Sequence, residues 1–150
     1  MIRIEEYIDE LTDILADAFG ERLVYIGLQG SYLRNEATEN SDIDIMAVID
    51  DISVEDLDTY RQALVSIGNF DKSCGFICGR ADLSHWNPLE LCHLLNTTKD
   101  YYGELKNLVP AYTMEDERNY VKFSLNNLYH EICHRYIHAD REHNISRLPV

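Results

Sequence analysis

Basic residues are scarce in this sequence. The 150 residues include 13 lysines and arginines against 27 aspartates and glutamates, which gives a formal net charge of −14. Proteins that bind nucleic acid neutralise its phosphates with a basic surface, so this balance argues against a polymerase, a tRNA-modifying enzyme or any protein with a long polyanionic substrate. An acidic surface instead attracts cationic molecules, and it also favours solubility.

Long apolar runs and an export signal are missing as well. No apolar run reaches the roughly eighteen residues that a membrane span needs, so the sequence predicts no membrane protein. The first six residues are typical of the start of an acidic helix rather than of a signal peptide. We therefore expect a cytoplasmic protein whose four cysteines are reduced, buried thiols. With 45% hydrophobic residues, the chain is long enough to bury a core.

Two apolar runs flank a polar stretch near the middle of the sequence. The first run ends at Gly30-Ser31, and the second begins at Asp42-Ile43-Asp44. Because side chains alternate along a strand, Asp42 and Asp44 share one face about 7 Å apart. Such a carboxylate pair can bind hard cations, and a Gly-Ser turn between strand and helix offers N–H groups and a hydroxyl to a phosphate. The combination indicates phosphoryl or nucleotidyl transfer.

This stretch resembles the signature of the DNA polymerase beta-like nucleotidyltransferase superfamily. That signature is an apolar strand, Gly-Ser, a spacer of roughly ten residues and Asp-x-Asp in a second strand. Gly30-Ser31, the spacer 32–41 and Asp42-Ile43-Asp44 match it. Gly-Ser-Tyr with Ser-Asp-Ile-Asp is most similar to small bacterial antibiotic-modifying and minimal nucleotidyltransferases. The alternative is a β-turn-β unit with two solvated aspartates on an edge strand.

The resemblance implies a function. A nucleoside monophosphate would move from ATP or another nucleoside triphosphate to a hydroxyl of a small acceptor, for which the acidic surface makes an aminoglycoside-like antibiotic one candidate. Asp42 and Asp44 would bind two magnesium ions, and Gly30 and Ser31 would orient the phosphates. Arg34 lies within reach of a triphosphate, although a solvated loop arginine is an equally good interpretation.

A third carboxylate is expected from the same resemblance. The superfamily carries it on a strand after the next helix, and Asp82 is our candidate for it as a further metal ligand. Asp71 is the alternative, and an ordinary turn aspartate is the plain interpretation of Asp82. In related enzymes the base that deprotonates the acceptor comes from beyond the sheet. Asp100 and Glu104 lie in that part of the sequence, and nothing selects one of them.

The order of apolar and turn residues predicts an α/β (α+β) fold, a small mixed sheet flanked by helices. Helical spacing predicts helices over 4–19, 53–67, 88–95 and 114–139, and apolar runs predict strands over 23–29, 43–49 and 73–79, with a polar connection at 97–104. The third strand is expected to continue or bend into 80–83.

Two domains are expected along the chain. Residues 1–110 would form the catalytic domain, and 111–150 would begin a C-terminal helical domain of the kind that antibiotic nucleotidyltransferases carry. The acceptor site would then be incomplete in this chain, or it would be completed by a second subunit in a homodimer.

Three other functions compete with this one. His130-Glu131-Ile132-Cys133-His134 is a literal H-E-x-x-H, which on a helix could bind zinc in a hydrolase. Only sixteen residues follow His134, which leaves little chain for a further ligand, so incidental metal binding by His130, His134 and His138 is the better interpretation. The chain could also be an antitoxin-like nucleotidyltransferase that modifies a protein partner, or a non-catalytic nucleotide-binding regulator. Because both signature aspartates are present, we favour catalysis.

Overall fold

One mixed sheet forms the centre of the computed structural model, which describes residues 2–138. Its strands lie in the order β3-β2-β1-β4. They are β1 (Leu23–Leu28), β2 (Ile43–Ile49), β3 (Ser73–Gly79) and β4 (Lys99–Tyr102). β1 pairs antiparallel with both β2 and β4, whereas β2 and β3 run parallel. The predicted mixed α/β architecture is confirmed.

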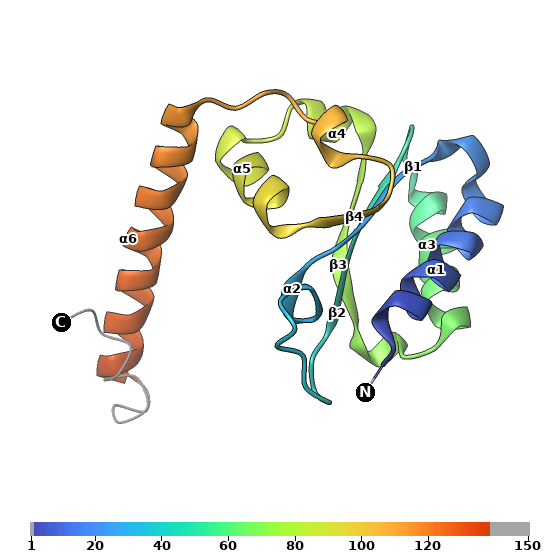
Figure 1. Cartoon of the computed structure of the whole chain (residues 1–150), viewed down its shortest axis with the longest axis horizontal. Helices are drawn as coiled ribbons and strands as arrows, with labels where there is room; N and C mark the ends of the chain where they lie inside the picture. The colour runs from blue at the N-terminus through green and yellow to red at the C-terminus, as the bar shows by residue number, and fades with distance from the viewer. Residues whose placement is uncertain (1, 139–150) are drawn as a thin grey trace.

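Two helices cover one face of the sheet, as Figure 1 shows: α1 (Ile4–Phe19) and α3 (Val54–Ile67). Apolar residues of α1 at helical spacing point at the sheet, and Ile8 and Leu11 are fully buried. They pack in one cluster with Ile26 of β1 and Ile45 of β2, which point to this face because side chains alternate along a strand. This is the larger of two cores.

The opposite face carries α4 (Arg80–Ser84) and α5 (Pro88–Thr97) (Figure 1). Tyr25, Met46 and Val48 of the sheet pack there against Leu83, in a second apolar cluster. This cluster begins at Met46 on β2. The residues of β2 that precede Met46 on the same face therefore lie beyond the apolar cover.

The long C-terminal helix α6 (Met114–His138) packs against α5. The hydroxyl of Tyr120 lies 2.5 Å from Nδ1 of His93, which joins the two helices. Leu125 and Leu128, on the predicted apolar face, are 59% and 51% exposed, and Ile132 on the same face is buried. The helix is confirmed as far as the structure describes it, and its predicted last residue, 139, lies outside the described residues. None of the described helices is long and apolar enough to cross a membrane.

Short elements fill the connections. They are α2 (Gly30–Leu33) and three turns of 3-10 helix, η1 (Gly20–Arg22), η2 (Phe70–Lys72) and η3 (Leu105–Asn107). The prediction of a polar connection over 97–104 is wrong, because β4 lies inside it. β4 sits at the sheet edge and its residues are exposed or only partly buried, so it lacks the alternating apolar pattern by which strands are recognised. The bend after β3 is the short helix α4.

A buried carboxylate ties α3 to the start of β1. Ser53 caps α3 by accepting a hydrogen bond from the backbone N–H of Asp56, and Asp56 accepts one in return from the backbone N–H of Ser53. Both terminal nitrogens of Arg22 donate to the Asp56 carboxylate. These interactions lower the pKa of Asp56 to about 2, with the Arg22 hydrogen bonds as the largest cause.

We predict that Asp56→Asn lowers the melting temperature at neutral pH, whereas Asp58→Asn on the exposed side of α3 has little effect. The pKa of Asp56 in the folded state lies below its ordinary value of 3.8. The stabilisation is therefore complete above about pH 5 and is lost as the pH falls towards 2. The difference in melting temperature between wild type and Asp56→Asn should shrink over that interval in calorimetric scans. A difference that does not depend on pH would contradict the assignment.

Candidate active site

Asp42 and Asp44 lie at the N-terminal end of β2, on the sheet face that α4 and α5 cover farther along. Asp44 is the second residue of the strand, and Asp42 immediately precedes it. Both stand beyond the apolar cover that begins at Met46, so Asp42 is exposed and Asp44 is only partly buried. The backbone N–H of Gln29 donates to the carbonyl oxygen of Asp44 over 2.9 Å. This bond extends the ladder between β1 and β2 to the turn at Gly30.

The glycine of the Gly30-Ser31 turn lies directly against the Asp44 carboxylate. Gly30 has φ +68°, in the left-handed region that favours glycine. A Cβ atom at this position would collide with Oδ2 of Asp44. The turn therefore needs glycine both for its backbone angle and for the close approach of Asp44. Ser31 follows within α2 and is partly buried.

Arg34 stands at the C-terminal end of α2 and is exposed. Its Nε forms an ion pair with Oε2 of Glu36 at 2.8 Å. An exposed ion pair of this kind contributes little stability, so a phosphate could compete with Glu36 for the guanidinium. The sequence elements of the signature are thus brought together, with Arg34 three residues beyond Ser31.

Cys74 is the site residue that our sequence analysis missed. β2 and β3 pair in parallel with Asp44 opposite Cys74, so both side chains point to the same face. Burial raises the pKa of the Cys74 thiol, and the charges of Asp44 and Asp42 raise it further. The prediction that all four cysteines are buried is wrong here, because Cys74 is exposed. The apolar runs 43–49 and 73–79 have the same length. Aligning them as parallel strands pairs Asp44 with Cys74.

The structure does not bring Asp82 to the other two carboxylates. Asp82 belongs to the first turn of α4, where its Oδ2 accepts a hydrogen bond from the backbone N–H of Gly79 over 2.8 Å. Gly79 pairs with Ile49, five positions beyond Asp44 on β2, which corresponds to about 16 Å along the strand. A helix-capping role accounts for Asp82, and we do not carry it into the proposed metal site.

The alternative carboxylate, Asp71, lies at the other end of β3. It is exposed in η2, two residues before Ser73, which pairs with Ile43. Asp71 is therefore at the same end of the sheet as Asp42, although no contact between the two carboxylates is observed.

The two candidate bases occupy different positions. Asp100 of β4 pairs with Gly27, which pairs with Met46, so Asp100 projects from the same face as Asp44. Its Oδ1 accepts a hydrogen bond from the hydroxyl of Tyr25 over 2.6 Å. Glu104 lies after the strand and pairs with Lys106 and Asn107. Of the two, Asp100 is the one that the sheet places on the carboxylate face.

The carboxylate pair fits magnesium rather than a metal held by the protein alone. Within residues 2–138, no group of three or more His, Cys, Asp or Glu side chains is arranged to hold a metal ion. Magnesium usually keeps several waters and is bound by one or two carboxylates together with substrate phosphates. Asp42 and Asp44 beside the Gly30 turn supply that set of donors. The same observation leaves His130 and His134 of α6 without a third protein ligand among the described residues.

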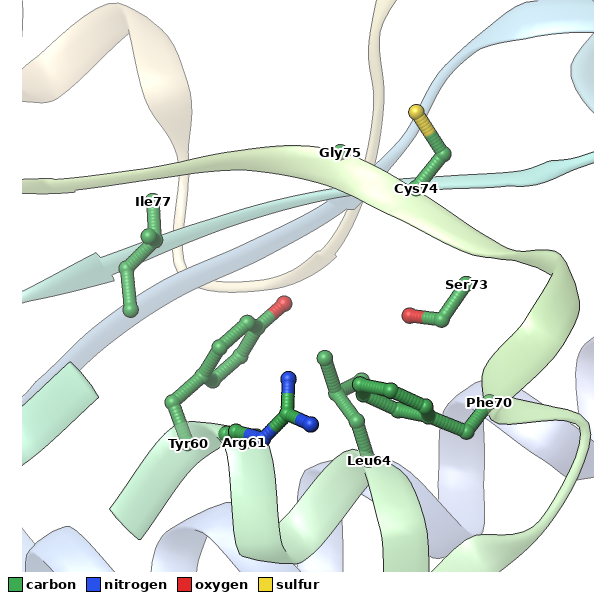
Figure 2. A pocket seen from close by; sticks show the side chains of 8 residues that line it. All are labelled: Tyr60, Arg61, Leu64, Phe70, Ser73, Cys74, Gly75 and Ile77. Atoms are coloured by element: carbon green, nitrogen blue, oxygen red, sulfur yellow. The ribbon is translucent and has the colours of Figure 1, made fainter. Parts of the chain in front are cut away.

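A cavity of about 370 Å³ lies on the other face of β3, between this strand and α3. Figure 2 shows Ser73 and Ile77 on the side of β3 that faces Tyr60 and Leu64, whereas the thiol of Cys74 points away from them. The cavity and the carboxylates are therefore separated by the sheet, and the cavity is not part of the candidate active site.

Residues 8–75 match the family model of the nucleotidyltransferase domain. No curated protein sequence matches the chain. Among solved structures, spectinomycin adenyltransferase AAD(9) from Enterococcus faecialis, crystallised with ATP and spectinomycin, is similar with a TM-score of 0.58 and 18% identity. That match covers 88% of this chain and 68% of the other. At this identity the likeness shows a shared fold.

Two further structures are similar at lower scores. One is the complex of a tri-AMPylated HEPN toxin from Shewanella oneidensis with its MNT antitoxin, with a TM-score of 0.44 and 18% identity over 89% of this chain and 93% of the other. The other is a putative nucleotidyltransferase from Sulfolobus solfataricus, with a TM-score of 0.40 and 15% identity over 74% of this chain and 92% of the other.

The family match includes every part of the signature, from the apolar strand through Gly30-Ser31 to Asp42 and Asp44, and it ends just after Cys74. The fold around these residues agrees with it, since the two aspartates and the Gly-Ser turn meet at one end of the sheet. Residues 8–75 of this chain therefore match a nucleotidyltransferase domain, and the fold around them is the one expected for it.

Proposed function

We propose that Asp42 and Asp44 bind magnesium together with a nucleoside triphosphate, and that the chain transfers the nucleoside monophosphate to a hydroxyl of a small acceptor. The observation that carries this proposal is the contact between Gly30 and the Asp44 carboxylate. It puts a turn suited to phosphates directly beside a carboxylate suited to a hard cation. Asp42 and Asp44 would hold a magnesium ion, and the Gly30-Ser31 turn would hold the phosphates of the substrate.

Each residue of the site has a part in positioning the substrate. The backbone of Gly30 and the hydroxyl of Ser31 orient the β- and γ-phosphates, and Arg34 neutralises part of their charge. Asp42 and Asp44 would hold the magnesium that accompanies the nucleotide. Magnesium, two ions in our proposal, supplies charge neutralisation at the α-phosphate and pyrophosphate and lowers the pKa of the acceptor hydroxyl.

ATP and a small cationic acceptor are the first substrates to test. The spectinomycin adenyltransferase that shares the fold was crystallised with ATP and spectinomycin, which supports this choice of donor and of a small-molecule acceptor. The net charge of −14 supports a cationic acceptor, because a surface of one sign raises the local concentration of molecules of the other. We further propose that residues 1–110 form the catalytic unit and that α6 begins a second, helical unit.

A nucleotide-binding regulator without transfer activity is the second candidate. The observation in its favour is that the position opposite Asp44 on β3 holds the thiol of Cys74 and not a further carboxylate. The two candidates share the nucleotide site and differ only in whether the α-phosphate is transferred.

Binding of ATP separates the proposed site from a coincidence of motif. We predict that isothermal titration detects ATP binding that requires magnesium in wild type and is lost in Asp44→Asn. Asp82→Asn is the matched control, because it removes the same charge about 16 Å along the strand. It should lower thermal stability by uncapping α4 and leave magnesium-dependent binding in place. Equal loss of ATP binding in both variants would show that Asp82 belongs to the site. Unchanged ATP binding in Asp44→Asn would refute the proposal.

Incubation with α-labelled ATP then separates transfer from regulation. Label on a small hydroxyl-bearing acceptor supports the first candidate, and label on a protein identifies an antitoxin-like enzyme. Magnesium-dependent binding without any transfer supports the regulator.

The turn can be tested without changing any charge. Gly20 and Gly30 both have positive φ, but an added Cβ at Gly20 meets no atom within 4 Å, whereas at Gly30 it meets the Asp44 carboxylate. Alanine at either position costs about 1–3 kcal/mol of backbone strain, because both glycines have a positive φ. We predict that Gly30→Ala abolishes magnesium-dependent ATP binding. Gly20→Ala should retain this binding, although its melting temperature should be similar to that of Gly30→Ala. Retained binding in a folded Gly30→Ala protein would show that the close contact is not needed.

A further inference from the structure

Cys74 occupies a position whose chemistry the proposed function does not use. The parallel register sets it opposite Asp44, and neighbouring strands lie about 4.8 Å apart, so the thiol and the Asp44 carboxylate project side by side. Figure 2 shows the thiol on the side of β3 that faces away from the α3 cavity. It therefore belongs to the face that carries Asp42 and Asp44, and it is exposed there.

The backbone holds this position firmly. Gly75, the next residue, has φ +144°, and a Cβ atom there would collide with the backbone of Ile45. β3 is thus pressed against β2 at the residue that follows Asp44. A larger residue at 75 would push the strands apart, so the pairing of Asp44 with Cys74 depends on this glycine.

The side chain at 74 decides how much negative charge the site offers to a cation. Two carboxylates, Asp42 and Asp44, face the site, and the position opposite Asp44 on β3 holds sulfur. A thiol carries no charge, and sulfur prefers soft cations to hard ones such as magnesium or manganese. Since affinity for hard cations rises with the number of charged oxygen ligands, two carboxylates alone bind them weakly.

We propose that Cys74 is a specificity-determining residue of the site: it faces the same ion as Asp42 and Asp44, and it makes binding of a hard divalent ion depend on the phosphates of the nucleotide. This inference rests on the proposed function. The ion would bind as its complex with the nucleoside triphosphate. The phosphate oxygens then supply the negative charge that an uncharged thiol at position 74 does not. The free protein has little affinity for magnesium.

Binding of manganese without nucleotide tests the inference directly, with electron paramagnetic resonance of free Mn²⁺ as the measurement. Wild type and Cys74→Ser should bind Mn²⁺ weakly, and ATP should strengthen the binding. Cys74→Asp should strengthen binding of Mn²⁺ alone by about tenfold or more, because it adds a third carboxylate. Ser73→Asp is the matched control, since the same charge then stands one residue away on the opposite face and should have little effect.

Three outcomes overturn the inference. The first is an unchanged affinity for Mn²⁺ in folded Cys74→Asp, and the second is an equal gain in Ser73→Asp, which would be an effect of net charge alone. The third is tight binding of Mn²⁺ to wild type without ATP. The Asp44→Asn titration keeps the two proposals apart. If Asp44→Asn loses ATP binding and Cys74→Asp gains no affinity for Mn²⁺, only the inference about Cys74 fails.

A soft cation provides a test that needs no added carboxylate. Cadmium bound beside Asp44 should coordinate the sulfur of Cys74, which produces a sulfur-to-cadmium charge-transfer band in the ultraviolet. The band should appear in wild type, disappear in Cys74→Ser and weaken in Asp44→Asn. A band that survives in Cys74→Ser would come from another cysteine, and a band unaffected in Asp44→Asn would place the thiol outside the site.

Discussion

The site depends on the pairing of β2 with both of its neighbours. On one side the antiparallel ladder with β1 continues through the hydrogen bond from the backbone N–H of Gln29 to the carbonyl oxygen of Asp44. This bond places Gly30 next to the Asp44 carboxylate. On the other side the parallel ladder with β3 delivers Cys74 to the same carboxylate. A shift of one residue in either ladder would turn these side chains to the other face. The backbone register therefore sets the chemistry of the site.

The two cores hold this register in place. α1 and α3 bury the inner face of the sheet through residues such as Ile26 and Ile45, while α4 and α5 cover the outer face only from Met46 onward. The uneven cover on the face of α4 and α5 leaves Asp42 exposed just before β2 and Asp44 only partly buried, on a strand whose other residues are buried. A rigid strand with an open end can hold charged ligands in a fixed position and still admit a large substrate.

Local patterns in the sequence were enough to predict most of the fold. β1, β2 and β3 are continuous apolar runs, and α1 has apolar residues at helical spacing, so each appeared within a residue or so of its prediction. β4 was missed because an exposed edge strand carries no apolar alternation and is defined by its partner. The same reasoning explains the site. Gly30, Ser31, Asp42 and Asp44 lie within fifteen residues and form one motif.

The third position could not be predicted in the same way. It depends on which residue of β3 pairs with Asp44, and that register comes from tertiary packing. The sequence predicts Asp82 as the third carboxylate, because it follows the third apolar run. In the structure the residue of β3 opposite Asp44 is Cys74, and Asp82 binds the backbone of Gly79. In our proposal the chain combines a carboxylate pair with an uncharged thiol on the neighbouring strand, and this thiol is recognised only once the two strands are aligned.

A crystal structure with manganese and a non-hydrolysable ATP analogue is the most direct test of this account. Anomalous scattering would locate the manganese ions without reference to any motif. We predict a manganese ion bound to the carboxylates of Asp42 and Asp44, with the triphosphate against the turn at Gly30-Ser31 and the sulfur of Cys74 facing the ion. A nucleotide bound elsewhere, for example in the cavity between α3 and β3, or manganese that does not contact Asp44, would contradict the account.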